Sequence, residues 1–575
     1  MHKLKFRPIK LAVSLFVWIA LWLFFSICNK YHLLYVEGTQ MFLFTKEYLT
    51  ETILHPGGVA DFISRFLIQF YHYPLIGGAI IATFLIMLQY GVEVVSRRIS
   101  GDKGLFSFSF IPLIFYCALL CNENYTLAGL IGMVFSVWAA WLYININSQV
   151  YKRISALVFI PVLWLLFGGG VVSMILLVVF YEIVTIDKHN IISLLFILIS
   201  SLAIFLLAPM LTPLISGTNL ILGARYFRLI DAPLIMFLTL WSSPLIVVLL
   251  IHLLPSIKNK VIQIISVILV LSGGAYIVNG SYMYLYEEVF GYLNLVQNRK
   301  WEEVIEKAKK RKPSSMLATN CINLALGETG QMGEKMFDFF QYGNSSLMQD
   351  YKDDILFSGE ILFNLGLINE AQRYAYESME SIPDQQKGVI FVKRLAETNL
   401  VAGRDEVASK YLRILGKTLF YKQWSQDRLK LVGDSVLISE DPVYGHLRKI
   451  QPDSNFVFMS GSLPQMLEIL LRQHPDNHLA YDYLMASCLL TKSLGIFAEK
   501  VRISSTMPRH YKEALVLLSC LNHQSPDMLP SCVKSSMIDD FENFITKYNA
   551  IGGNPAELQG QYGKTYWYYI TYTKM

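Results

Sequence analysis

The stretch SALVFIPVLWLLFGGGVVSMILLVVFYEIVTI, residues 155–186, decides the fold class of this chain. Glu182 is its only charged residue. A helix needs about 20 apolar residues to cross the hydrocarbon core of a bilayer. Gly168, Gly169 and Gly170 interrupt the run, and glycine tolerates the backbone angles of a tight turn. We therefore predict a hairpin of two membrane-spanning helices, over residues 155–169 and 170–186.

Seven further apolar runs flank this hairpin, at residues 10–28, 76–95, 105–121, 127–145, 191–210, 233–254 and 262–280. Together they predict a polytopic, all-α bundle of about nine transmembrane helices. The first run follows a basic start, as in a signal peptide. It is too long for one and is not followed by a small-x-small cleavage site, so we interpret it as a retained helix.

Charge divides the chain into two predicted domains. Residues 1–280 hold 27 of the 93 charged residues, and residues 281–575 hold the other 66. A soluble protein carries about 25% charged residues, so only the second part has a composition near that of a soluble domain. We predict a transmembrane domain at 1–280, with a long external first loop at 29–75, and a soluble helical domain at 281–575.

The placement of lysine and arginine predicts the orientation, because short cytoplasmic loops carry an excess of basic residues. With the N-terminus in the cytoplasm, five basic residues fall outside and twelve fall inside: Lys3, Lys5, Arg7, Lys10, Arg97, Arg98, Lys103, Lys152, Arg153, Lys188, Lys258 and Lys260. Residues 281–575 are then predicted to lie in the periplasm, on an inner-membrane protein. The net charge of only +5, without a basic block, argues against a nucleic-acid partner.

The second domain is predicted to consist of paired amphipathic helices. Small residues recur twelve apart, at Gly359 and Ala371, Ala396 and Ala408, and Ala486 and Ala498. In a tetratricopeptide repeat (TPR), such positions allow the two helices of a repeat to approach closely. We predict a TPR-like α-solenoid that binds a periplasmic protein or peptide. A generic helical bundle is the alternative.

Five motifs point to a family: EGTQMFLF at 37–44, HPGG at 55–58, FLIQFY at 66–71, NLALG at 323–327 and KTLFY at 417–421. With them the chain resembles a family of uncharacterised multi-pass proteins of Bacteroidota, known only as a domain of unknown function. This resemblance implies an inner-membrane protein with a periplasmic C-terminal half. It implies no activity and no catalytic residues.

The architecture also resembles GT-C glycosyltransferases, in particular the transmembrane O-mannosyltransferases that carry tetratricopeptide repeats. That likeness implies a polyprenyl-phosphate-linked sugar donor and an essential carboxylate in the first external loop, where this chain has Glu37. The GT-C fold typically has an acidic pair there, whereas this chain has Glu-Gly-Thr-Gln. On this hypothesis Glu37 is the general base, and His55 and Arg65 of the same loop bind substrate. The alternative is a solvated loop carboxylate.

Arg225 and Arg228 precede the eighth predicted span. Three residues apart, they would share a face of a helix and could clamp a phosphate. The alternative is lipid-headgroup contact together with an internal pair between an arginine and Asp231. Glu93 and Glu182 are expected to reach the membrane surface from the ends of their spans.

No cofactor and no metal site is predicted, and Asp353-Asp354 and Asp539-Asp540 are interpreted as solvated helix ends. The seven cysteines are interpreted mainly as small buried hydrophobes, with a bond between Cys520 and Cys532 as the alternative. Three functions are compatible with these patterns: a scaffold that anchors a periplasmic repeat domain, a GT-C-like transferase and, less well supported, a transporter. The lipid bilayer is a partner in all three.

Overall fold

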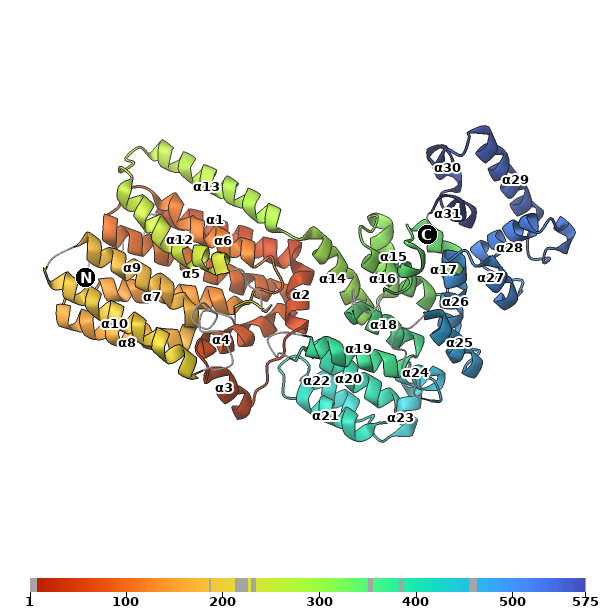
Figure 1. Ribbon diagram of the computed structural model, residues 1–575, viewed down its shortest axis with the longest axis horizontal. Helices are drawn as coiled ribbons and strands as arrows, with labels where there is room; N and C mark the ends of the chain where they lie inside the picture. Colours follow the sequence, from red (N-terminus) through yellow and green to blue (C-terminus); the bar gives the residue numbers. More distant parts are fainter. Residues whose placement is uncertain are drawn as a thin grey trace. The chain divides into compact units, whose positions relative to one another are not determined.

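Helices make up most of the chain (Figure 1). The computed structural model describes residues 8–185, 188–211, 226–228, 234–349, 355–381, 387–454 and 463–573. Among these residues no strand forms, and a single antiparallel bridge joins Tyr125 and Phe227. The all-α prediction is confirmed.

The helices form two compact units. The first unit contains Met1–Glu287 together with two segments from much later in the sequence, Glu380–Ile390 and Arg413–Ser425. The second unit contains Glu288–Met379, Phe391–Leu412 and Gln426–Met575. The chain therefore leaves and re-enters the first unit twice.

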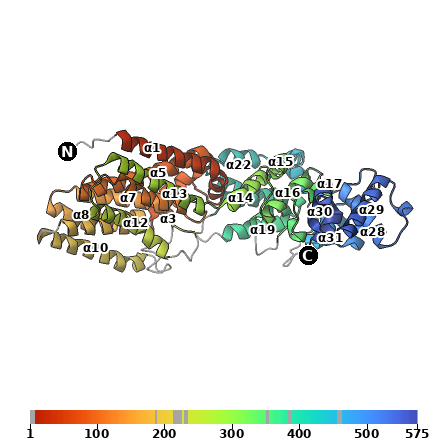
Figure 2. The ribbon, with the colours of Figure 1, turned by 90° about the horizontal axis from the view of Figure 1, so that it is seen from above.

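The first unit is a bundle whose long helices run roughly parallel to one another (Figures 1 and 2). Its elements are α1 (Pro8–Leu23), the π-helical η1 (Phe24–Cys28), α2 (Lys30–Gly38), α3 (Lys46–Ile53), α4 (Gly58–Ile68), η2 (Gln69–His72), α5 (Pro74–Ser100), η3 (Phe106–Phe110), α6 (Ile111–Leu119), α7 (Leu127–Ile144), α8 (Gln149–Phe167), η4 (Gly168–Gly170), α9 (Val171–Val184), α10 (Lys188–Leu211), α12 (Leu234–Leu253) and α13 (Lys260–Ser281).

In the part of the chain that the structure describes, five helices are long and apolar enough to cross a membrane: Pro8–Cys28, Pro74–Ser100, Leu127–Ile144, Gln149–Val184 and Lys260–Ser281. Three predicted spans correspond to shorter apolar helices, Phe106–Leu119, Ile191–Ile204 and Leu240–Leu253. These helices are consistent with a membrane protein.

The glycines at 168–170 separate α8 from α9, as the sequence predicts. Gly168 has φ +66°, a backbone conformation that favours glycine. The two helices on either side of this turn pack against each other, and both contact α7 and α10. A Cβ atom on Gly170 would lie 2.7 Å from the backbone of Gly132 in α7, so the turn also requires a residue without a side chain.

A row of polar contacts joins α1 to α5. It pairs Lys10 with Glu93, Ser14 with Gln89 and Trp18 with Thr83, at distances of 3.0–3.1 Å. The residues on α1 are four apart, so they lie on one face of the helix. A Cβ atom on Gly78 of α5 would lie 2.3 Å from Ser26 Oγ, which shows how closely the backbones approach.

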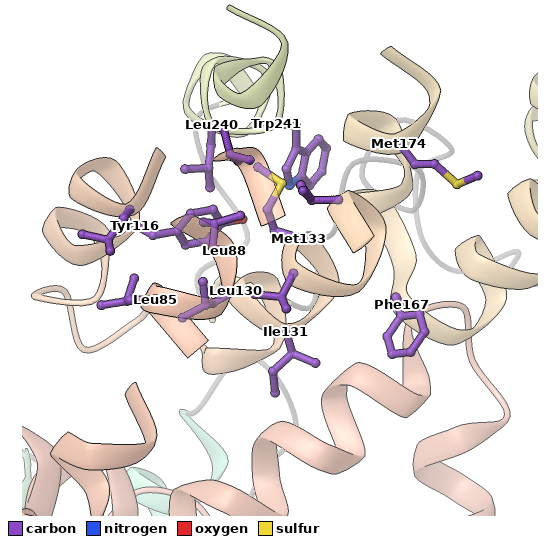
Figure 3. Close-up of a cluster of buried hydrophobic side chains, with 14 of the residues drawn as sticks. Leu85, Leu88, Tyr116, Leu130, Ile131, Met133, Phe167, Met174, Leu240 and Trp241 are labelled. Carbon is purple, nitrogen blue, oxygen red and sulfur yellow. The ribbon is translucent and has the colours of Figure 1, made fainter. Parts of the chain in front are cut away.

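The core of the first unit forms where α5, α6, α7 and α12 meet (Figure 3). Leu85 and Leu88 of α5, Leu130 of α7 and Trp241 of α12 are all buried there. The helices that surround this core expose apolar side chains outward, as expected where lipid replaces water.

The second unit is also helical. Its elements are α14 (Tyr284–Gln297, which begins in the first unit), α15 (Trp301–Lys310), α16 (Met316–Glu328), α17 (Met332–Lys335), η5 (Met336–Asp338), η6 (Gly343–Ser346), α18 (Ile355–Leu365), α19 (Ile368–Glu380, whose last residue belongs to the first unit), α20 (Val389–Val401, which begins in the first unit), α21 (Asp405–Leu415, which ends in the first unit), α22 (Lys422–Leu429, which begins in the first unit), α23 (Ser435–Glu440), α24 (Tyr444–Ile450), α25 (Leu463–Gln473), α26 (His478–Leu490), α27 (Leu494–Lys500), α28 (Arg509–Leu521), η7 (Pro526–Met528), α29 (Ser535–Ala550), α30 (Pro555–Tyr562) and α31 (Tyr566–Tyr572).

Candidate functional site

Glu37 lies near the end of α2 and is buried, with 6% of its surface exposed. Its carboxylate accepts a hydrogen bond of 2.8 Å from the hydroxyl of Tyr421. Burial, and then the adjacent Glu37 carboxylate, raise the pKa of Tyr421 well above its usual value. The phenol therefore keeps its proton and acts as a donor to Glu37.

Aromatic rings surround this pair. The ring of His72 stacks on Phe420 at 5.0 Å, and its Nδ1 atom lies 3.9 Å from Glu37 Oε2. Phe420 also packs edge-on against Phe70 and Tyr73. On the neighbouring face of α4, Phe62 and Phe66 pack against Phe42. The aromatic side chains at 62, 66 and 70 thus pack against other rings of the protein.

Three of the sequence motifs meet at this site. The backbone N–H of Phe44 donates to the carbonyl of Lys417, and Glu37 and Phe70 contact Tyr421 and Phe420 respectively. The motifs EGTQMFLF, FLIQFY and KTLFY therefore form one contiguous cluster within the first unit.

The space beside Glu37 is small. A cavity of about 10 Å³ remains among its surroundings, lined by Glu37, Gln40, Phe42, Ile68, Gln69, Val389, Thr418, Phe420 and Tyr421. Such a volume holds about one water molecule. This cavity has no room for a sugar.

Arg65 and His55 do not join Glu37 in that cavity. The Arg65 guanidinium pairs with Asp61 on the same helix, with contacts of 2.7 and 2.8 Å. Its backbone carbonyl accepts a hydrogen bond from the side-chain amide of Gln40. His55 lies in the turn between α3 and α4, and its carbonyl accepts a hydrogen bond from the N–H of Gly58. These contacts position the loop.

Arg228 contacts the segment at 29–75, between the first two apolar helices. Its guanidinium donates a hydrogen bond of 2.7 Å to the hydroxyl of Thr39, two residues after Glu37. Residues 226–228 are not helical, because Phe227 pairs with Tyr125 and the N–H of Arg228 donates to the carbonyl of Asn124. Arg228 is therefore not on a helix, and the predicted pairing of the two arginines stays a prediction. Arg225 and Asp231 lie outside the described residues.

Polar contacts at the start of α2 join residues that no sequence motif relates. The carboxylate of Glu287 accepts hydrogen bonds of 2.8 Å from the N–H groups of Tyr31 and His32, which belong to the first turn of this helix. A negative charge is favourable at a helix N-terminus. Burial, and then the nearby Arg228, lower the pKa of His32 to about 4. His32 is therefore neutral at physiological pH.

Glu182 is completely enclosed by protein, so the expectation that it reaches the membrane surface is wrong. It lies 3.5 Å from the ammonium group of Lys152 and accepts a hydrogen bond from Tyr143. Glu93 is also buried and pairs with Lys10 and Arg97. Both carboxylates are thus held by cations of the protein.

All seven cysteines are unbonded, Cys520 and Cys532 included. Four of them are buried, as expected: Cys117, Cys121, Cys321 and Cys488. Cys28 and Cys520 are exposed, and Cys532 is partly exposed, so burial does not account for these three.

Comparison with known proteins places the chain in one family. The model of a family described as "Family of unknown function (DUF6057)" matches residues 5–573, so the chain belongs to this family. No curated protein and no solved structure matches the chain.

Proposed function

We propose that this member of the DUF6057 family is a membrane anchor that presents a periplasmic, TPR-like helical domain to protein partners in an envelope process. The observation that carries the proposal is the environment of Glu37. Its carboxylate is buried, accepts the Tyr421 hydrogen bond and borders a cavity of only about 10 Å³. These contacts fit a residue that fastens a late segment of the chain to the membrane unit better than a base that receives a substrate.

Helix pairing in the second unit supports the TPR-like part of the proposal. Ala371, Ala375 and Ser378 of α19 are all buried, and a Cβ atom on Gly359 of α18 would touch Tyr374 at 3.3 Å. Ala396 and Ala408 are buried as well. Ala498 is exposed, so the third small-residue pair does not follow the repeat pattern.

A cavity of about 220 Å³ in the second unit offers a place for a partner side chain. It lies where the turns before α19 and α21 meet the segment after α24, and is lined by Leu367, Ile368, Asn369, Glu370, Ala402, Arg404, Gln451, Pro452, Asp453 and Ser454. Most of this lining is polar, which suits a peptide more than an apolar ligand.

Photo-crosslinking tests this binding role. A photoreactive amino acid at Asn369, in the full-length chain in its native membrane, should give discrete protein adducts. Arg404→Glu in the same chain should remove them, because it reverses a charge in the cavity lining. The exposed Lys430→Glu is the matched control and should leave the adducts unchanged. Adducts that are absent, or that survive Arg404→Glu, count against the proposal.

We also propose nine transmembrane helices, with the N-terminus in the cytoplasm of a Bacteroidota-type cell and the second unit in the periplasm. The five long and three shorter apolar helices support this topology, since Gln149–Val184 contains the two helices α8 and α9. In spheroplasts, a membrane-impermeant maleimide should label Val436→Cys, in the second unit, and Glu51→Cys. Gly101→Cys should react only after permeabilisation, and Cys28, Cys520 and Cys532 are replaced by Ser throughout. The reverse labelling would overturn this orientation.

The contact between Thr39 and Arg228 favours a second candidate, a GT-C-like transferase that uses a polyprenyl-phosphate-linked sugar. It joins a predicted phosphate-binding arginine to the loop that carries the predicted base. Purified protein would be assayed for sugar transfer from a polyprenyl-phosphate donor. Loss of transfer in Glu37→Gln, with full transfer in the exposed loop variant Glu47→Gln, would establish this function in place of the scaffold.

A further inference from the structure

Four apolar side chains of the first external loop are exposed together on and beside α3. We name them the α3 apolar edge: Phe44 (54% exposed), Leu49 (38%), Ile53 (37%) and Leu54 (80%). Leu49 and Ile53 are one helical turn apart and share a face of α3. Glu47 and Glu51 lie on the opposite face, so this short helix is amphipathic.

The other side of α3 is already in contact with protein. Thr45 caps its N-terminus by accepting a hydrogen bond from the N–H of Tyr48. Tyr48 packs against Phe42, and its hydroxyl donates to the carbonyl of Met41. These contacts fix the orientation of α3 on the first unit, so Leu49 and Ile53 stay exposed.

The loop that carries the α3 apolar edge meets α8, which has an exposed apolar stripe of its own. Val158, Val162 and Leu165 are exposed and recur at helical spacing along one of the candidate spans. The N–H of Gly57, three residues after Leu54, donates a hydrogen bond of 2.9 Å to the carbonyl of Leu165. The loop thus reaches α8 at the end of its exposed apolar stripe, and α4 packs between α3 and α8 (Figure 1).

We propose that the α3 apolar edge inserts into the lipid bilayer at the boundary between headgroups and acyl chains, beside α8. An amphipathic helix in that position buries its apolar face by roughly 5–10 Å. Lys46, exposed at the start of α3, then lies at the level of the lipid phosphates, and Glu47 and Glu51 face water. This inference does not depend on whether the second unit binds a partner.

A protein partner fits this surface less well than lipid. A specific interface buries about 800 Å² on each partner, and four partly exposed side chains offer much less. The helix α8, which the same loop contacts through Gly57, is part of a candidate membrane span whose exposed apolar side chains suit lipid.

Fluorescence quenching tests the insertion. The full-length chain, with Cys28, Cys520 and Cys532 replaced by Ser, is labelled with bimane at Ile53→Cys and reconstituted into phosphatidylcholine vesicles that contain doxyl-labelled acyl chains. Glu51→Cys is the matched control on the opposite face of α3. Val158→Cys on α8 is the lipid-facing reference, and Val407→Cys in the second unit is the aqueous reference.

Doxyl lipid should quench the label at Ile53 to about the level seen at Val158, and about threefold more than at Glu51. Aqueous iodide should quench Glu51 and Val407 more than Ile53. Equal iodide quenching at Ile53 and Val407 would overturn the proposal. A disulfide between two copies through Ile53→Cys would also overturn it, because a second copy would then cover the edge. Leu49→Cys repeats the measurement if Ile53→Cys lowers the thermal midpoint.

Discussion

His32 connects the stability of the first unit to pH. It is buried in α2, where burial and Arg228 lower its pKa to about 4. In the unfolded chain a histidine has a pKa of about 6.5. Between these two values the unfolded state binds more protons than the folded state, so stability rises with pH across that window.

We expect the free energy of unfolding to keep its full value above about pH 6.5 and to fall by up to about 3 kcal/mol as the pH drops to about 4. His32→Gln, which cannot be protonated, should flatten this dependence. The measurement is the thermal midpoint in detergent across that pH range. The exposed His523→Gln should keep the wild-type slope, and an unchanged slope in His32→Gln would show that another group carries the effect.

The Tyr421 hydroxyl is expected to stabilise the folded protein, because it donates a hydrogen bond to the buried carboxylate of Glu37. Tyr421→Phe removes the hydrogen bond of 2.8 Å and leaves the carboxylate without its phenol donor. We expect a loss of about 1–3 kcal/mol, seen as a lower thermal midpoint of the purified protein. Tyr568→Phe, whose hydroxyl donates to an exposed backbone carbonyl, is the control and should lose much less. A Tyr421→Phe variant as stable as the wild type would contradict the anchoring role of this pair.

At the scale of helices, the buried pair of Lys152 in α8 and Glu182 in α9 connects the two helices on either side of the glycine turn. Removing one partner leaves an uncompensated buried charge, whereas replacing both by apolar residues of similar size removes the problem. Each of these two buried charges is therefore stabilised only while its partner is present.

Glu182→Leu alone should destabilise the first unit by about 3–5 kcal/mol, and Lys152→Met alone by a similar amount. The double variant should recover most of this loss. Thermal midpoints of the four proteins in one detergent form a complete double-mutant cycle. Additive losses in the double variant would mean that the two charges act independently.

The positions of the apolar helices are the part of this fold that the sequence predicts best. Apolar runs long enough to span a bilayer predict helices because the backbone must satisfy its own hydrogen bonds in lipid, and the turn at Gly168 follows from glycine's backbone freedom. Residues 226–228 were predicted less well. Their backbone pairs with residues 124–126, and such pairing depends on tertiary contacts that a local pattern does not contain.

At the scale of the whole molecule, contacts between distant residues account for what the sequence did not predict at the candidate site. Glu37 was singled out from its position in the first loop, but its partner Tyr421 lies 384 residues later. No periodicity or charge pattern relates two such residues. The motif KTLFY was the only signal, and a single sequence does not say what a motif touches.

A chain that ends at residue 287 should not fold as the full chain does. It lacks Glu380–Ile390 and Arg413–Ser425, which belong to the first unit. Phe70 and His72 then lose Phe420, and Glu37 loses Tyr421. We expect the truncated protein to aggregate during size-exclusion chromatography in a detergent that keeps the full-length protein monodisperse. A monodisperse truncated protein with the wild-type thermal midpoint would show that the two late segments are dispensable.

The late return of the chain to its first unit also has a consequence during synthesis. A ribosome adds about 5–20 residues per second, so residue 425 follows residue 287 by roughly 7–28 s. Over that interval the apolar helices of the first unit are already made, while the pocket for Phe420 and Tyr421 stays open. Assembly of the first unit therefore waits for more than a hundred residues of the second unit to emerge, and the nascent protein passes through an incomplete stage that a chaperone or protease can recognise.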